Sequence, residues 1–351
     1  MSKLTIVLLI KGRENFTKRW LDYMSKINYQ ENILIGDGDP KTKIKKLIKN
    51  KRYSKLKIKY LNYNNKNYND YYFMMYDLVN RYVETEYVRF CDNDDFILQN
   101  QQKNLIAYFD KNTKLASVGD FQIRFEILNN NKLYGDKLYF FFEGIHRFSE
   151  RFSEKTIKEM FKNYQGLFYN IFKNKHMKKI LFEIYKLNFS DLELRDFYFK
   201  LRLLSMGNIT YLKQSSYIRQ HGTSQTSSNF YYSENFFDKD IKKDTSKLIY
   251  KISNVYKKKF NKNPKKIEKI IINSYKNYLN IVIAHNKRIF LYPKYFKLKK
   301  IIFEKYRFIF LFLRKLQNLT FNSDLKKLYG VNKISYDKEI IFLKKFIKNS
   351  D

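Results

Sequence analysis

The sequence predicts an α/β fold, in which a mainly parallel β-sheet is flanked by helices and is followed by a basic, helical C-terminal region. Over the first third of the chain, short apolar runs alternate with charged segments of helical pattern, which is typical of parallel sheets. The chain has 351 residues, and 44% of them are hydrophobic. This is enough for one large domain, or for a medium domain with a smaller one.

Four apolar runs are predicted to be strands, and they cover residues 4–10, 32–36, 56–61 and 87–91. Helices are predicted between them over residues 15–27, 43–50 and 69–83. Helical crossovers join parallel strands, and ligands of such sheets bind beyond the carboxyl ends of the strands. Two of these four runs end in acidic residues, at Asp37 and at Asp92.

The middle of the chain is mixed, with strands predicted over residues 115–125 and 209–212 and helices over 168–185 and 194–206. The composition then shifts, because residues 226–351 carry 30 Lys and Arg against 10 Asp and Glu. This tail is helical in pattern, with Pro264 and Pro293 as expected breaks. We therefore predict a domain over residues 1–226 and a helical, Lys-rich C-terminal region over residues 227–351.

The formal net charge is +36, and 56 lysines far outnumber 14 arginines. AT-rich codons favour Lys, Asn, Ile and Tyr, so part of this bias has a compositional explanation. A field this positive attracts polyanions whatever its origin. Nucleic acid, anionic lipid and phosphorylated substrates are the partner classes that it indicates.

The N-terminal apolar run is predicted to be a buried strand and not a signal peptide. It is short, and Lys11, Arg13 and Glu14 follow it without a small-residue cleavage site. No stretch approaches the roughly 20 apolar residues that span a bilayer. The single cysteine, Cys91, makes no internal disulfide and is predicted to lie in the core. We expect a cytoplasmic protein, with peripheral attachment to the inner face of the cell membrane left open.

The main candidate site is Asp92-Asn93-Asp94-Asp95, which directly follows an apolar run. Its three carboxylates repel one another unless a cation or a helix N-terminus offsets their charge. Oxygen ligands suit Mg²⁺ or Mn²⁺, which also bridge diphosphate oxygens and neutralise charge on a leaving diphosphate. The alternative interpretation is that these acidic residues bind no metal and form the N-cap and solvated first turn of a helix over residues 96–109.

Three early segments stand in a distinctive order and spacing: Leu4–Arg13, Ile33–Gly38 and Tyr87–Phe96. They resemble a strand with an Asn-Arg-type turn, a strand ending in Asp-Gly-Ser, and Asp-x-Asp, which occur in this order in glycosyltransferase family 2, a family with the GT-A fold. Three later segments resemble a bacterial branch linked to surface polysaccharides; they are Lys162–Gln165, Asp196–Phe199 and Tyr217–Gly222. The resemblance covers residues 3–226, so residues 1–226 are expected to bind the nucleotide-sugar and to carry out catalysis.

The resemblance implies a role for each matching residue. Asp37 matches the aspartate that contacts the nucleobase, typically uracil, and Asp92 matches a carboxylate near the ribose and the metal. Asp94 matches the main ligand of Mn²⁺ or Mg²⁺, and Asp95 is expected to assist it. The other donor-binding residues are Arg13, Arg219 and His221, of which the last two match a loop that closes over the diphosphate. Otherwise His221 is an ordinary exposed histidine in a flexible polar stretch.

An inverting transferase needs a carboxylate base that takes the proton of the acceptor hydroxyl. In the family this base belongs to a Glu-Asp pair at the start of a late helix, and Asp196 matches it best, with Glu193 as the second candidate. Three residues apart, they share one helix face. The alternative is that both are solvated acids paired with Arg195 or Arg202.

Residues 301–315 are strongly apolar and have basic flanks. They are predicted either to lie on an anionic membrane surface or to pack on the catalytic domain with a solvated lysine face. Membrane contact would suit a lipid-linked acceptor.

The sequence thus predicts a metal-dependent inverting glycosyltransferase of bacterial surface polysaccharide synthesis. By the resemblance, its donor is a UDP-sugar and its acceptor a glycan or lipid-linked glycan. One alternative is a nucleic-acid-binding protein with a basic, aromatic surface. Because the basic residues form no recognised nucleic-acid motif, no nucleic acid is expected. The other is a sugar nucleotidyltransferase, but Lys11-Gly12-Arg13 is a poor Gly-rich phosphate loop.

Overall fold

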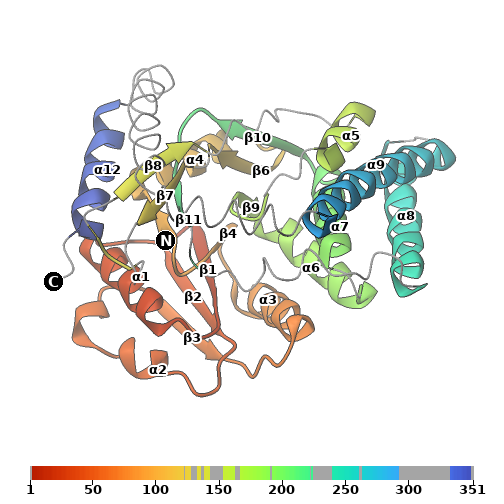
Figure 1. Cartoon of the computed structure of the whole chain (residues 1–351). Coiled ribbons are helices and arrows are strands. Elements are labelled where there is room, and N and C mark those ends of the chain that lie inside the picture. The colour runs from red at the N-terminus through yellow and green to blue at the C-terminus, as the bar shows by residue number, and fades with distance from the viewer. Residues whose placement is uncertain are drawn as a thin grey trace.

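The computed structural model describes residues 2–121, 123–127, 133–135, 138–142, 153–162, 167–189, 192–221, 223, 239–260, 263–291 and 333–348. Within these residues the chain forms a seven-stranded and a four-stranded β-sheet, with helices packed around them (Figure 1). The larger sheet is mainly parallel and carries helices on both faces, so the predicted α/β fold class is confirmed.

The larger sheet has the strand order β10-β6-β9-β4-β1-β2-β3. Its strands are β1 (Leu4–Ile10), β2 (Asn32–Asp37), β3 (Ile58–Asn62), β4 (Tyr87–Cys91), β6 (Leu115–Asp120), β9 (Ile171–Lys173) and β10 (Asn208–Leu212). The strands β3, β2, β1 and β4 are parallel neighbours, as the sequence predicts. Only β9 runs against its neighbours β4 and β6 within this sheet. The carboxyl ends of the four N-terminal strands therefore lie along one edge.

The buried strands of this sheet send alternate side chains to two hydrophobic clusters. In β1, Val7 and Leu9 belong to one cluster, and Ile6 and Leu8 belong to the other. This is the period of two that a strand imposes on its side chains. Cys91 is buried in the second cluster, so its predicted place in the core is confirmed.

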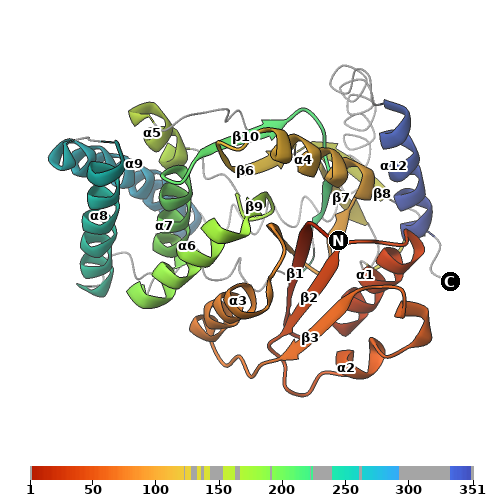
Figure 2. The ribbon, with the colours of Figure 1, turned by 180° about the vertical axis from the view of Figure 1, so that it is seen from behind.

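Helices from both halves of the chain cover the two faces (Figures 1 and 2). One face is covered by α3 (Tyr68–Tyr82), α6 (Asn174–Leu187) and α7 (Leu192–Leu204). Outside this layer, α5 (Glu154–Lys162), α8 (Lys239–Phe260) and α9 (Pro264–Leu291) pack against α7 and against one another. The other face is covered by α1 (Glu14–Lys26), α4 (Gln99–Lys111) and α12 (Lys333–Lys348). The short helices α2 (Ile44–Leu47) and η1 (Lys51–Tyr53) pack against α1. The described part of the C-terminal region is thus helical, as predicted, and contributes to both clusters.

The smaller sheet covers part of the second face and has the order β5-β11-β7-β8. It comprises β5 (Phe96–Ile97), β7 (Ile123–Ile127), β8 (Leu138–Phe142) and β11 (Tyr217–His221). β5 directly follows the acidic segment, and β11 pairs with it in antiparallel fashion. This pairing brings residues 217–221 next to residues 92–95.

Two predicted elements are wrong in this region. The strand predicted over residues 115–125 is two strands, β6 and β7, which belong to different sheets. The helix predicted over residues 168–185 begins only at Asn174, because residues 171–173 form β9 between β4 and β6. An apolar run of this length is compatible with a buried strand or a helix, and only its tertiary neighbours decide between them.

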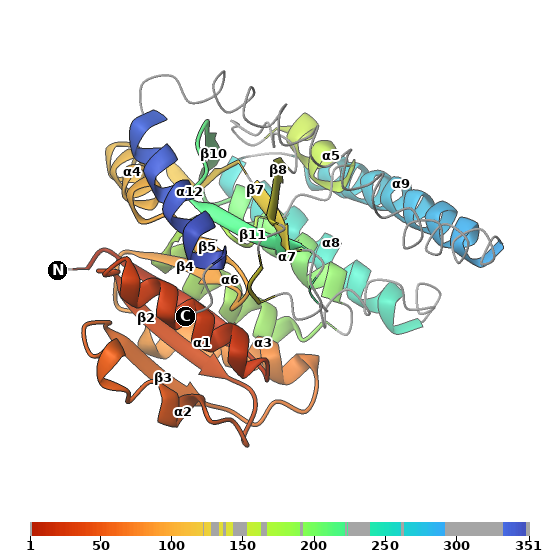
Figure 3. The same cartoon turned by 60° about the vertical axis from the view of Figure 1, so that its left-hand side comes forward.

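The helix α12 docks on α1 and α4 at the other end of the molecule from α8 and α9 (Figures 1 and 3). Phe346 is buried there, with its ring centroid 5.4 Å from that of Tyr23 and 6.1 Å from that of Phe96. The Glu339 carboxylate accepts a hydrogen bond of 2.9 Å from the Asn100 N–H. The last described helix is therefore part of the N-terminal core.

Replacing Phe346 by alanine is expected to lower the free energy of unfolding by about 3–5 kcal/mol, the usual cost of emptying a buried phenylalanine site. Denaturant unfolding measures this loss. Phe342→Ala is the matched control, because its side chain on the same helix is 39% exposed, and it should cost less than about 1 kcal/mol. Equal losses for the two variants would contradict this docking of α12.

None of the described helices combines the length and the apolar character that crossing a membrane requires. The apolar basic segment over residues 301–315 lies outside the described residues, so both predictions for it stay open.

Candidate functional site

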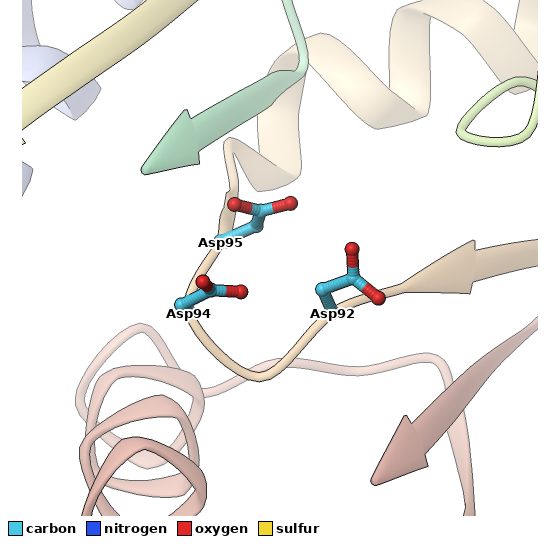
Figure 4. Close-up of side chains that lie close together, drawn as sticks. All are labelled: Asp92, Asp94 and Asp95. Carbon is cyan, nitrogen blue, oxygen red and sulfur yellow. The ribbon is translucent and has the colours of Figure 1, made fainter. Parts of the chain in front are cut away.

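The loop after β4 brings three carboxylates together at the carboxyl edge of the larger sheet. Asp92, Asp94 and Asp95 each offer an oxygen, and these oxygens lie within 4.8 Å of one another. Figure 4 shows the three side chains facing a common space. Asn93 points the other way, because its Nδ2 donates to Thr17 Oγ1 of α1 at 2.9 Å. On one side of the loop lie the three carboxylates, and on the other side Asn93 anchors the loop to α1.

Asp95 is held by the smaller sheet. Its Oδ2 accepts a hydrogen bond from the Tyr217 hydroxyl, and its Oδ1 accepts one from the Gln220 N–H, both at 2.8 Å. Arg219 Nε lies 3.9 Å from Asp95 Oδ2. Both oxygens of this carboxylate are thus engaged by β11.

Within the described part of the chain, Asp92 and Asp94 each have one oxygen that accepts a hydrogen bond and one that does not. The Tyr169 hydroxyl donates to Asp92 Oδ2 at 2.5 Å, and Asp94 Oδ2 accepts from Arg13 Nη2 at 2.8 Å and from Thr223 Oγ1 at 2.7 Å. The Oδ1 atoms of Asp92 and Asp94 accept no hydrogen bond from the described residues. These two oxygens are the first candidates for ligands of a cation.

The alternative interpretation of the cluster as a helix N-cap is wrong. The next helix, α4, begins at Gln99 and not at residue 96, and Leu98 occupies the N-cap position without a side-chain hydrogen bond. Asp94 and Asp95 are buried rather than solvated. The strand β5 separates the carboxylates from the helix, so the helix N-terminus does not offset their charge.

Burial and mutual repulsion both act on these carboxylates. Burial raises the pKa of Asp92 and raises that of Asp95 well above its usual range, and the Asp94 charge adds to both shifts. The nearby Arg219 partly opposes the shifts. A divalent cation would offset the remaining repulsion, and Mg²⁺ and Mn²⁺ prefer such oxygen ligands. The residues present therefore fit the metal that the sequence predicts.

Arginines surround the carboxylates. Arg13 ends the loop after β1 in a left-handed conformation (φ 58°) at the N-cap of α1, from where it reaches Asp94. Arg219 stacks on the Tyr169 ring at 4.6 Å. Its register partner on the neighbouring strand β7 is Arg124. Burial, followed by repulsion from Arg219, lowers the pKa of Arg124 to about 10. Cations held this close together suit a ligand that carries several negative charges.

The flexible loop predicted over residues 219–224 is wrong for Arg219 and His221, because both lie in the strand β11. Pairing with β5 and β7 fixes this segment. His221 is half-buried, and its Nδ1 lies 3.5 Å from Arg124 Nη1, so it is not an ordinary exposed histidine. Gly222, which suggested a loop, lies outside the described residues.

Asp37 lies at the same edge, at the end of β2. Its Oδ1 accepts from the Asp39 N–H and its Oδ2 from the Tyr60 hydroxyl, both at 3.0 Å. Burial raises its pKa, while these hydrogen bonds act in the opposite direction. Since β1 lies between β2 and β4, two strand spacings, or about 10 Å, separate Asp37 from Asp92.

Gly38 follows Asp37 and is required there by close packing. A Cβ atom on Gly38 would lie 2.4 Å from Asn65 Nδ2 and 2.9 Å from Asn65 Cβ. The backbone of Asn65 is itself fixed, because its N–H donates to the Gly38 carbonyl at 3.0 Å. The Asp-Gly pair thus lets the loops after β2 and β3 approach each other closely.

The candidate base Asp196 lies in the first turns of α7. Its carboxylate is 22% exposed and forms an ion pair of 2.6 Å with Lys200, whose ammonium group is buried. The predicted alternative pairing with Arg195 or Arg202 is wrong for Asp196, because Arg202 pairs with Glu183 and Arg195 binds the Phe189 carbonyl. Glu193 belongs to α7, but its side chain lies outside what the structure describes.

The start of α7 faces the carboxyl edge of the larger sheet. Arg195 Nη2 donates to Asn69 Oδ1, and the Arg195 guanidinium lies 4.6 Å from the centroid of the Tyr72 ring. Asn69 and Tyr72 belong to the first turns of α3, which begins where the chain leaves β3. Asp196 is therefore on the side of the sheet that carries Asp37 and Asp92.

No protein-family model matches the chain, and no curated protein matches its sequence. Among solved structures, the crystal structure of S. aureus TarS 1–349 is 13% identical, with a TM-score of 0.48, and the match covers 79% of this chain and 71% of that chain. The same fragment in complex with UDP is 13% identical at a TM-score of 0.47, with 83% and 72% covered. A further crystal structure of S. aureus TarS is 13% identical at a TM-score of 0.49, with 78% of this chain and 43% of that chain covered.

The sequence patterns assigned no role to three side chains of the site. Tyr169 and Tyr217 stack on each other with centroids 4.6 Å apart and hold Asp92 and Asp95 through their hydroxyls. Thr223 holds Asp94. In a chain with 31 tyrosines, one tyrosine carries no positional signal. Only the pairing of β5 with β11 and the turn before β9 bring these residues to the carboxylates.

Proposed function

We propose that the protein is a metal-dependent inverting glycosyltransferase of the GT-A type, which transfers a sugar from a nucleotide diphosphate donor to a glycan. The observation that carries this proposal is the pair of open carboxylate oxygens on Asp92 and Asp94, at the carboxyl end of β4 and inside a rim of arginines. The motif order that resembles glycosyltransferase family 2 supports the same activity. Residues 1–226 are proposed to be the catalytic part.

The donor is proposed to lie along the carboxyl edge, with its base near Asp37 and its diphosphate at the carboxylate cluster. The distance of about 10 Å between Asp37 and Asp92 leaves room for a ribose between them. Asp92 and Asp94 would hold Mn²⁺ or Mg²⁺, with Asp95 as an anchor that fixes the loop. The bound cation would neutralise charge on the leaving diphosphate. Arg13 and Arg219 would bind phosphate oxygens, and His221 lies on the same face of β11 as Arg219.

The transfer is proposed to be a direct displacement at the anomeric carbon. The acceptor oxygen forms the new bond to that carbon, and the bond to the diphosphate oxygen breaks with its electron pair going to the diphosphate. The acceptor proton goes to the Asp196 carboxylate, which acts as general base. The ion pair with Lys200 orients this carboxylate. A free or lipid-linked glycan of a bacterial surface polysaccharide is the proposed acceptor.

The test is incubation of the protein with separate nucleotide-sugars, each with Mn²⁺, Mg²⁺ or EDTA, while the release of nucleotide diphosphate is followed. Release is expected with at least one UDP-sugar and a divalent cation, and it should stop in EDTA. A protein that binds no nucleotide diphosphate in the presence of either cation would contradict the proposal.

Asp37→Asn is expected to weaken UDP binding about tenfold or more, because a hydrogen bond to a charged group contributes about 1.5–3 kcal/mol. The amide oxygen can still accept from the Asp39 N–H, so the fold should persist. Titration calorimetry with UDP and Mn²⁺ measures the loss. ADP serves as the control ligand, since a residue that reads uracil should change UDP affinity more than ADP affinity. Unchanged UDP affinity would remove Asp37 from the nucleobase site.

A further inference from the structure

A separate pocket of about 220 Å³ lies between the first turns of α3, the end of α6 and the start of α7. Its walls combine aromatic, aliphatic and polar groups, and the lining residues are Asn69, Asp70, Tyr72, Phe73, Leu181, Ile184, Tyr185, Asn188 and Arg195. None of these residues belongs to the carboxylate cluster or to the donor edge described above. The pocket is smaller than the roughly 300–1,000 Å³ of sites for drug-sized ligands, so it suits a single ring.

We propose that this pocket binds one sugar ring of the acceptor glycan, away from the hydroxyl that reacts. The inference rests on the proposed function, since it assigns the sugar to the acceptor of that reaction. Its first support is position. Arg195 lines the pocket and precedes Asp196, the proposed base, and α3 begins at the carboxyl edge of the sheet. A glycan in this pocket would therefore lie beside the helix that carries the proposed base.

The second support is an exposed aromatic surface at the pocket. Phe73 is 43% exposed and Tyr185 is 48% exposed, although both are large side chains of a type that is usually covered. The Tyr185 ring stacks on that of Tyr76 with centroids 4.6 Å apart and an interplanar angle of 4°. Stacking fixes the ring and leaves its outer face available. The negative face of an aromatic ring attracts the polarised C–H groups that line one side of a sugar.

The third support is the set of polar groups beside these rings. Arg195 is buried, and its bonds to Asn69 and to the Phe189 carbonyl hold the amide of Asn69 at the pocket wall. Asn188 ends α6 in a left-handed conformation with φ 42°, which places a second amide there. Amides offer both donors and acceptors, as sugar hydroxyl groups require. Apolar faces with a few convergent polar groups are characteristic of small-ligand sites.

The test uses saturation-transfer NMR with the full chain and four probes, the methyl glycosides of glucose, galactose, mannose and N-acetylglucosamine. At least one glycoside should bind the wild-type protein. Tyr185→Ala and Phe73→Ala should each weaken that binding about three- to tenfold, as expected from the loss of one aromatic contact. Tyr250→Ala is the matched control, because Tyr250 is 62% exposed on α8 and does not line the pocket.

Two results would overturn the assignment: no glycoside binds the wild-type protein, or binding is unchanged in both pocket variants. Binding of UDP with Mn²⁺ is measured on the same samples and should be unaffected in all three variants. Retained UDP binding without glycoside binding would refute the sugar pocket and leave the donor site standing. If the wild-type protein does not bind UDP, the proposed function is refuted instead. The NMR result would still show whether the pocket binds a glycoside.

Discussion

Asp94→Asn is expected to lower the turnover of nucleotide-sugar about 100-fold or more at saturating Mn²⁺. The change removes a charge and one of the two open oxygens that face the cluster, and an amide is a weaker ligand than a carboxylate for such a cation. A 100-fold loss corresponds to about 2.7 kcal/mol of transition-state stabilisation, which is within the range of a bound metal. Release of nucleotide diphosphate measures turnover, and calorimetry measures Mn²⁺ affinity in the same variant.

The fold should survive this change. Asparagine has almost the same shape, its amide oxygen can still accept from Thr223, and loss of one negative charge relieves repulsion inside the cluster. Asp110→Asn is the matched control, because Asp110 binds Lys3 and Tyr87 at the opposite, amino-terminal edge of the sheet. Asp94 would be excluded as a ligand if its variant kept both wild-type turnover and wild-type Mn²⁺ affinity.

Asp196→Asn is expected to lower kcat about 10²- to 10⁴-fold, the usual contribution of a general base. Affinity for UDP should change little, because Asp196 lies on α7 and not along the proposed donor edge. The measurement is sugar transfer to an acceptor or, where none is identified, transfer to water. Glu193→Gln is the comparison, since Glu193 is the second candidate base and precedes Asp196 by one helical turn on α7. A large loss in Glu193→Gln alone would assign the base to Glu193.

Because Asp196 forms an ion pair with Lys200, the Asp196→Asn variant can lose stability as well as activity. A second variant separates these two effects. Asp196→Asn removes the carboxylate that faces the buried ammonium of Lys200, and breaking a buried pair costs about 3–5 kcal/mol. The double variant Asp196→Asn with Lys200→Met removes both charges and should restore stability. It should stay inactive, because stability without the carboxylate does not replace the base. Recovery of turnover in the double variant would show that Asp196 acts only through folding.

The sequence alone predicts the N-terminal half of the sheet well. Residues 4–10 and 32–36 are continuous apolar runs, and helical patterns separate them from the next strands. Strands buried on both faces must be apolar at every position, so this signal is strong and local. The observed elements β1, α1, β2, α3 and β4 match the predicted ones to within a few residues.

The prediction is weaker where tertiary pairing decides the structure. Residues 171–173 become a strand because β4 and β6 lie on either side of them. Residues 217–221 contain polar and charged side chains and precede a glycine, which favours a loop, yet they pair with β5 and β7. Hydrogen bonds of this kind depend on distant segments, and no local pattern reports them.

For the candidate site, the sequence by itself determined which acids follow strands, and hence that Asp37 and the carboxylate cluster share one edge of the sheet. That conclusion needs only the rule that parallel strands point the same way. The tertiary structure decided which partner each carboxylate of the cluster has. It showed that β11 engages both oxygens of Asp95, and that Asp196 is paired with Lys200. It also showed that the described residues donate no hydrogen bond to one oxygen each of Asp92 and Asp94. Spacing along the chain gives the order of charges, but the partner that each charge meets is set by how the sheets and helices pack.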